Sequence, residues 1–127
     1  MRLLLDTHAI LWHTAKHPSL STAAREAIVN PANQLFISVA SLWEITIKVS
    51  LGKLTLKTPV SNVAKVYQGI GAVILPMTLD HALATGNLPW HHRDPFDRML
   101  IAQAQYEGLT LVSRDSLFAS YDLKIMW

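Results

Sequence analysis

Short apolar segments alternate along the chain with longer segments that have helical spacing. The short segments are flanked by polar or turn-forming residues, which is the pattern of buried strands. The expected strands are residues 2–5, 35–37, 72–75 and 109–112, with 123–126 as a possible final strand. Strands that alternate with helices predict a mostly parallel central sheet flanked by helices on both faces, which is the α/β class.

The longer segments carry start and stop signals for helices. Asn30-Pro31 ends one of them because the residue before a proline disfavours helical geometry, and Gly108 suits the position after another. Pro95 suits the first position of a helix. The expected helices are residues 7–16, 22–29, 39–50, 59–70, 79–85, 95–107 and 116–120, and residues 53–58 and 86–93 are expected to connect elements.

Length and composition describe one domain that covers residues 1–127. Half of the 127 residues are hydrophobic, so a substantial core can form. The chain contains no cysteine, which excludes disulfides, thiolate catalysis and cysteine-bound zinc. Asp6 interrupts the first apolar run, and no stretch approaches the roughly 18 apolar residues of a membrane span. We therefore expect a soluble, cytoplasmic protein with no membrane partner.

Four of the nine acidic residues fall where expected strands end or helices begin. Several carboxylates held close together repel one another unless a cation lies between them. Hard divalent cations such as Mg²⁺ take oxygen ligands, often carboxylates together with water and phosphate. The pattern suggests metal-dependent phosphodiester chemistry. The four candidate residues are Asp6, Glu44, Asp97 and Asp115.

Each acid also has a simpler interpretation. Asp6 and Asp115 could only cap the helices that follow them, and helix capping is the favoured role for Asp94, which precedes Pro95. Glu44 would complete a capping box with Ser41 if a helix began there. We favour Ser38 as the helix cap, because the apolar strand runs directly into it.

Basic residues lie beside the acidic ones. The net charge is +2, and an acidic centre with a basic margin suits a polyanion held over a metal. Surface ion pairing is the alternative explanation for any single arginine. The candidate phosphate-binding residues are Arg93, Arg98 and Arg114.

Other kinds of site find little support. No glycine-rich phosphate loop is present, and the adjacent His91 and His92 lack the spacing of a helical zinc pair. Trp12 and Trp43 are expected in the core, which leaves Trp90 as the tryptophan to consider for RNA stacking. The remaining acids are expected as solvated surface charges, and they are Glu26, Asp80, Glu107 and Asp122.

Taken in order, the acidic motifs resemble those of PIN domains, and more narrowly those of VapC-type toxins from toxin–antitoxin pairs. The matching segments are Leu3-Leu-Leu-Asp6-Thr7, Ser41-Leu-Trp-Glu44, Asp94-Pro-Phe-Asp97-Arg98 and Ser113-Arg-Asp115, and they span nearly the whole chain. The resemblance implies a compact α/β PIN fold and an endoribonuclease that depends on Mg²⁺ or Mn²⁺. It also implies a homodimer and a small antitoxin protein that blocks the groove.

The resemblance assigns a role to each matching residue. Asp6, Glu44, Asp97 and Asp115 map to the family's four acids, which bind metal and catalyse. Thr7 and Ser113 map to its small hydroxyl residues and, with the three arginines, are expected to contact the RNA substrate. The chain departs from many members after the fourth acid, where it reads Asp115-Ser-Leu-Phe118 instead of a longer acidic and aromatic run.

Three alternative functions remain open from the sequence. A PIN-domain nuclease could process RNA in a housekeeping role, or a PIN module could bind RNA or a partner without catalysis. A phospho-receiver domain also carries carboxylates at strand ends. No adjacent acidic pair follows the first strand here, however, and no lysine ends the final strand in the receiver pattern.

Overall fold

The computed structural model describes residues 1–127 and contains one five-stranded sheet with the order β3-β2-β1-β4-β5. All four neighbouring strand pairs are parallel, which confirms the expected sheet. The strands are β1 (Arg2–Leu5), β2 (Gln34–Ser38), β3 (Val73–Leu75), β4 (Thr110–Val112) and β5 (Ile125–Met126).

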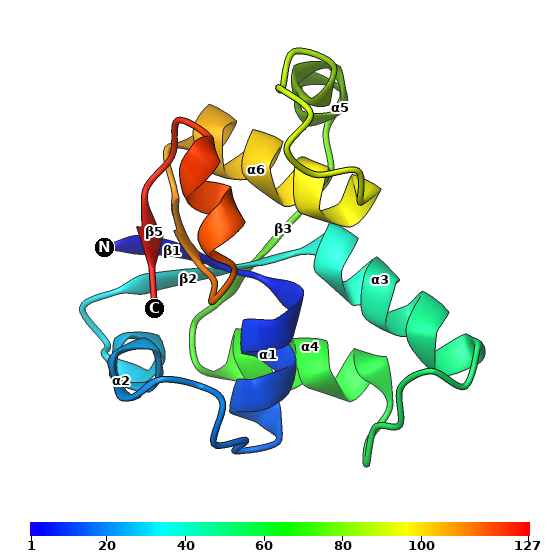
Figure 1. Cartoon of the computed structure of the whole chain (residues 1–127). Coiled ribbons are helices and arrows are strands. Elements are labelled where there is room, and N and C mark those ends of the chain that lie inside the picture. The colour runs from blue at the N-terminus through cyan, green and yellow to red at the C-terminus, as the bar shows by residue number, and fades with distance from the viewer.

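Helices cover both faces of the sheet (Figure 1). Helices α1, α2 and α4 lie on one face, α5, α6 and η1 lie on the other, and α3 extends from the end of β2. None of the helices combines the length and apolar character needed to cross a bilayer. The helices are α1 (Thr7–Thr14), α2 (Thr22–Val29), α3 (Val39–Ser50), α4 (Val60–Gly69), α5 (Leu79–Thr85), α6 (Pro95–Glu107) and the 3₁₀ helix η1 (Ser116–Ser120).

The central strand β1 supplies side chains to two separate cores. Leu3 and Leu5 pack with Ile10 of α1 on one face, and Leu4 packs with Leu100 of α6 on the other. Successive side chains of a strand point to opposite faces, so one short apolar run anchors both helical layers. Each of these leucines is fully buried. Burying such a side chain stabilises the fold by roughly 1.5–3 kcal/mol relative to leaving it exposed. The strand that is packed on both faces therefore ends directly before Asp6.

Local capping signals explain most helix boundaries. The Ser38 hydroxyl accepts a hydrogen bond from the backbone N–H of Ala40 at 3.0 Å, which confirms Ser38 as the cap of α3. Helix α6 begins at Pro95 and ends before Gly108, whose φ of 67° is readily adopted by glycine. Helix α1 ends at Thr14, two residues earlier than expected.

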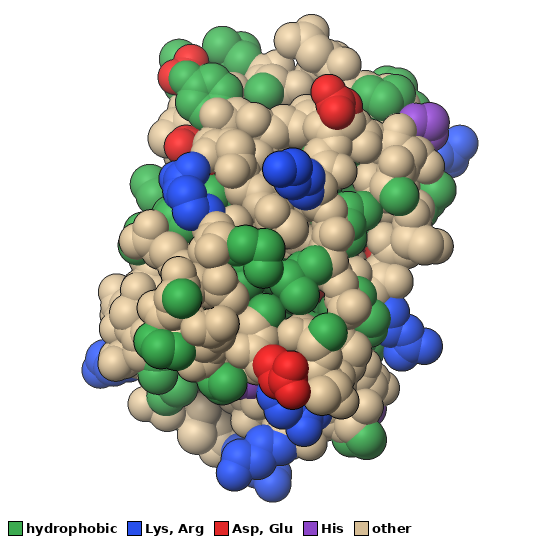
Figure 2. Space-filling model, turned by 90° about the vertical axis from the view of Figure 1, so that its left-hand side faces the viewer, with side chains coloured by type: hydrophobic (Ala, Val, Ile, Leu, Met, Phe, Trp, Pro, Cys, Tyr) green, Lys and Arg blue, Asp and Glu red, His purple; other side chains and the backbone are tan.

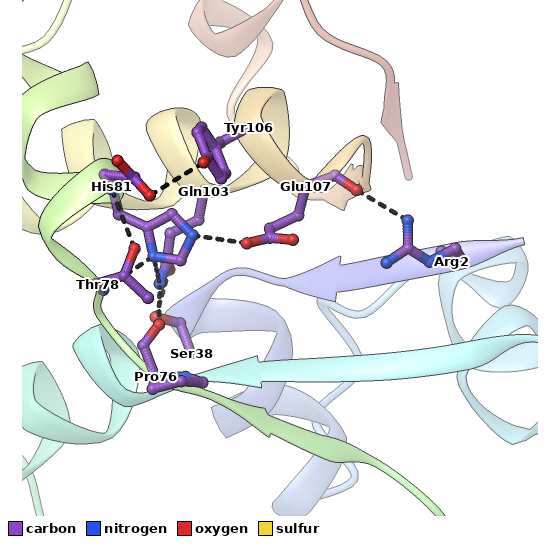
Figure 3. A network of polar contacts seen from close by, with 9 residues as sticks. Arg2, Ser38, Pro76, Thr78, His81, Gln103, Tyr106 and Glu107 are labelled. Atoms are coloured by element: carbon purple, nitrogen blue, oxygen red, sulfur yellow. Dashed lines mark hydrogen bonds and ion pairs between the residues drawn. The ribbon is translucent and has the colours of Figure 1, made fainter.

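A buried polar network ties α5 and α6 to the ends of β2 and β3 (Figure 3). The backbone N–H of Thr78 donates to Nδ1 of the buried His81, so Nε2 carries the proton and donates to Glu107 at 2.9 Å. The Ser38 hydroxyl donates to Gln103 of α6 while it caps α3. The expectation that Glu107 is only a solvated surface charge is wrong, because it pairs with a buried imidazole.

Candidate active site

The amino-terminal ends of α1, α3 and α6 lie at the carboxyl edge of the sheet (Figure 1). The four candidate acids belong to this part of the chain, because Asp6 precedes α1, Glu44 and Asp97 lie near the starts of α3 and α6, and Asp115 precedes η1. Asp6 follows β1 and Asp115 lies beyond the neighbouring strand β4. The Asp97 carboxyl group interacts electrostatically with Glu44 and Asp115, and Asp6 interacts with Asp115. The fold therefore brings together four acids that are far apart in the sequence.

Asp6 is a helix cap as well as a member of this cluster. Its carboxylate accepts a hydrogen bond from the backbone N–H of Ala9 at 2.7 Å. Burial raises the pKa of Asp6, and the nearby Ser113 side chain and the hydrogen bond from Ala9 offset only part of that effect. Ser113 is itself buried, and its hydroxyl accepts a hydrogen bond from the backbone N–H of Asp115 at 3.1 Å.

Glu44 is buried on α3 and has two partners. The Thr7 hydroxyl donates to its Oε1 at 2.6 Å, and the Lys48 ammonium lies 2.9 Å from its Oε2. Residues four apart on a helix are neighbours, so the Glu44–Lys48 pair is visible in the sequence, although Lys48 was not predicted as a site residue. Thr7, expected to contact substrate, instead positions a carboxylate in this structure.

Asp97 lies in the first turn of α6, and no ion pair or hydrogen bond to its carboxylate is present. Burial, together with the nearby carboxylates of Asp94, Glu44 and Asp115, raises its pKa to about 6, although His92 acts in the opposite direction. Asp94 caps α6 through hydrogen bonds from Phe96 and Asp97, as expected. Asp97 is therefore the acid whose charge is least compensated by the protein.

Asp115 is the most exposed of the four acids and is held by a histidine. His92 Nε2 lies 3.1 Å from its Oδ2, and the backbone N–H of Leu117 donates to its Oδ1. Slight burial raises the pKa of Asp115, but these two partners outweigh it and lower the pKa overall. The His92 ring stacks on Phe118 with centroids 4.6 Å apart. Sequence reasoning did not identify His92, because its loop position carries no periodic signal.

The structure separates the three predicted arginines. Arg98 is buried, its guanidinium covers the Trp90 ring at 3.7 Å, and it donates to carbonyl oxygens. An expected role in binding phosphate does not fit these contacts, which fix the loop before α6. Arg93 and Arg114 are exposed and form no ion pair. The carbonyls that bind Arg98 belong to Thr85, Leu88, Pro89 and His92.

The donor atoms of the cluster suit a hard cation. They are carboxylate and hydroxyl oxygens, and Asp97 has no basic partner. The buried hydroxyl of Ser41, one turn before Glu44 on α3, has no hydrogen-bond partner. No three acidic or histidine side chains are arranged as a ready-made cation site. Repulsion between unscreened carboxylates favours a wider separation of the acids, and the ion pair with Lys48 draws Glu44 towards that lysine.

Two tryptophans near the cluster are less buried than the sequence suggested. Trp43 is 54% exposed and contacts only the edge of Phe96 among aromatic rings, so the expectation of a core position is wrong. Trp12 packs against the core but remains partly exposed. Trp90 is exposed, as expected for its loop.

Comparisons with known proteins agree with this architecture. The PIN domain family matches residues 3–124. Ribonuclease VapC22 of Mycobacterium tuberculosis is 30% identical, with coverage of 94% of this chain and 91% of that protein.

Two solved structures show the same fold. VapBC2 from Rickettsia felis, bound to a DNA fragment from its promoter, has a TM-score of 0.75 at 20% identity and covers 99% of this chain and 98% of that one. VapC20 of M. tuberculosis, a toxin that cleaves the sarcin–ricin loop, has a TM-score of 0.60 at 18% identity and covers 95% of both chains.

Proposed function

The chain belongs to the PIN-domain family, and from that premise we propose that it is a metal-dependent endoribonuclease, the toxin of a toxin–antitoxin pair. The observation that carries the proposal is the convergence of Asp6, Glu44, Asp97 and Asp115 at one edge of the sheet. A similar curated protein is a ribonuclease of the VapC group, which supports RNA as the substrate.

We assign the four acids to binding Mg²⁺ or Mn²⁺. Asp6 and Asp97 would be the principal ligands, with Glu44 and Asp115 completing the site. When bound, the metal lowers the pKa of a water molecule and stabilises negative charge on the phosphate. The protein's own part is positional, because the Thr7 hydroxyl holds Glu44 and the backbone N–H of Ala9 holds Asp6. Glu44 is a candidate to accept the proton of the attacking water.

Arg93 and Arg114 would hold the RNA backbone beside the acids. Both are exposed, whereas Arg98 is already bonded to carbonyl oxygens. Contacts to phosphate fix the position of a strand but carry no base sequence information. We therefore assign to these two arginines affinity and salt dependence, not the choice of cleavage site.

We further propose an antitoxin protein as the cognate partner, and a homodimer as the assembled form. The support for the antitoxin is similarity to solved structures of the VapBC family of toxin–antitoxin systems. The homodimer is what the resemblance to VapC-type toxins implies. We also propose a cytoplasmic location, because the proposed substrate is cellular RNA.

The test is cleavage of RNA by purified protein with Mg²⁺ or Mn²⁺, and its loss in excess EDTA. Asp6→Asn and Asp97→Asn should each remove most of the activity and leave the circular dichroism spectrum unchanged. Asp122→Asn is the matched control, because Asp122 is an exposed acid outside the cluster, and it should retain full activity. Full cleavage in EDTA by protein free of contaminating nuclease would reject the metal mechanism.

A further inference from the structure

An aromatic and cationic cluster lies along α1, beside the acids. Three aromatic rings surround that of Trp12. The ring centroid of His8 lies 5.2 Å from the Trp12 centroid, and those of His17, which is stacked, and Trp127 lie 5.8 Å from it. The guanidinium of Arg114 lies 5.7 Å from the same ring. Arg114, His8 and His17 are exposed, and Trp12 is partly exposed, so the cluster is open to solvent.

An open cavity of about 350 Å³ borders the same part of α1. Its lining includes His8 and Trp12 from α1, Lys48 from α3 and Lys53 from the segment that follows α3, with Leu54 among the apolar residues. Small-molecule sites are commonly cavities of about 300–1,000 Å³ with an apolar lining and a few polar groups. A planar aromatic ligand with an attached negative charge matches this combination.

The cluster and the cavity adjoin the proposed catalytic acids. The charge of His8 acts on the carboxyl groups of both Asp6 and Asp115, and Arg114 directly precedes Asp115 in the chain. Lys48, on the cavity wall, is bonded to Glu44. An RNA strand with one phosphate held over the acids would place a neighbouring nucleotide within reach of α1.

We propose that Trp12, with His8 and the cavity beside them, forms a subsite that stacks an unpaired nucleobase of the RNA adjacent to the cleaved phosphate. The subsite rests on the proposed ribonuclease function and adds a base contact that the four acids do not provide. Stacking on an aromatic ring is worth about 1–3 kcal/mol per base, or roughly five- to a hundredfold in affinity.

The charge of the surroundings favours RNA as the occupant. Every charged side chain named in the cluster and cavity is basic or a histidine, which suits a polyanion. The face at the amino ends of β1 and β2 differs, because basic and acidic side chains are scattered there among uncharged ones (Figure 2). Aromatic rings beside cations are typical of surfaces that hold single strands.

The experiment compares two fluorescein-labelled probes, a single-stranded A₁₂ RNA and an abasic backbone of the same length, by anisotropy at low salt in EDTA. Trp12→Ala should weaken binding of A₁₂ at least fivefold and leave the abasic probe unchanged, because only the base contact is lost. Trp12→Phe should restore most of the affinity for A₁₂. Lys53→Ser should weaken both probes equally, as expected for a phosphate contact. Tyr106→Ala, an exposed aromatic at the far end of α6, is the matched control.

His8→Ala changes an exposed residue and provides the same comparison if Trp12→Ala does not fold. Equal binding of A₁₂ by wild type, Trp12→Ala and His8→Ala would overturn the subsite. It would also be overturned if these variants bound RNA normally but were no longer neutralised by a co-expressed antitoxin, because the surface would then belong to a protein partner. Absence of cleavage by the wild type would reject the ribonuclease, and the binding comparison would still decide the subsite.

Discussion

Asp97 carries an unfavourable charge in the folded protein. Its carboxyl group is partly buried, lacks a basic partner and faces the charges of Asp94, Glu44 and Asp115. Its pKa of about 6 exceeds the ordinary value of 3.8, so the folded protein binds this proton more tightly than the unfolded chain does. Between these pH values, stability therefore falls as pH rises, since ionisation is more costly in the folded state. A bound cation would remove that cost.

We predict that Asp97→Asn raises the melting temperature of metal-free protein at pH 7. Allowing for the partial exposure of Asp97, the gain is about 1 kcal/mol, or roughly 3–6 °C. The difference between variant and wild type should shrink towards zero near pH 4, where the wild-type carboxyl is protonated. Mg²⁺ should stabilise the wild type more than the variant. Calorimetry across pH 4–7 checks this, and a variant that melts lower at pH 7 would contradict the clustering of the acids.

Thr7 offers a second test at the scale of single residues, because its hydroxyl is the hydrogen-bond donor to Glu44 at 2.6 Å. Thr7→Val keeps the shape but loses the donor, and we expect kcat to fall about tenfold, for a lost bond worth about 1.5 kcal/mol. Thr7→Ser retains the donor and should keep most of the activity. Single-turnover cleavage at matched folded protein measures both. Wild-type turnover by Thr7→Val would mean that the orientation of Glu44 does not matter.

At the scale of elements, Arg98 fastens the connection between α5 and α6. Its guanidinium, on α6, binds the carbonyl of Thr85 at the end of α5 and that of Pro89 within the connection. We predict that Arg98→Lys destabilises the protein by about 2–4 kcal/mol, because an ammonium cannot reproduce the planar set of donors. Urea unfolding measures this loss.

Arg93→Gln is the contrasting variant, since Arg93 is exposed and unpaired. Stability should stay within about 0.5 kcal/mol of the wild type. The slope of log affinity for single-stranded RNA against log salt should weaken by about 0.7, the expected contribution of one phosphate contact. If Arg98→Lys were as stable as the wild type and showed the altered salt slope, Arg98 and not Arg93 would be the residue that contacts phosphate.

The elements could be predicted because their signals are local. Ser38, Asp94 and Gly108 mark helix ends through contacts within a few residues, and the structure has those ends. The early end of α1 is the exception, since Lys16 adopts a φ of 53° that composition does not reveal. The parallel sheet followed from the alternation of strands and helices.

The site could be predicted only in part. Asp6 and Asp115 followed from their places after strands, because parallel strands present their carboxyl ends at one edge. The burial of Arg98 and the contact of His92 with Asp115 could not be predicted from positions relative to strands. Both contacts depend on the path of the connection between α5 and α6, which no periodic pattern specifies.

At the scale of the whole molecule, a ribonuclease with an exposed site needs a means of control. Four acids at an open edge, one of them without a basic partner, suit an inhibitor that supplies a positive charge. Arginine can pair with carboxylates through two parallel hydrogen bonds, so we expect the antitoxin to place one against the cluster. Apolar residues of the inhibitor should cover exposed surface on α1 and α4.

We predict that expression of the wild-type protein arrests bacterial growth, and that co-expression of the cognate antitoxin relieves the arrest. Asp6→Asn at a matched protein level should be harmless, because the same fold then lacks a principal metal ligand. Changing the inhibitor's arginine to alanine should weaken neutralisation, since carboxylates at the site would lose their compensating charge. The measurements are growth after induction and protein level by immunoblot. If the wild type and Asp6→Asn were equally harmless, or equally toxic, a housekeeping or binding role would become the better account of this PIN domain.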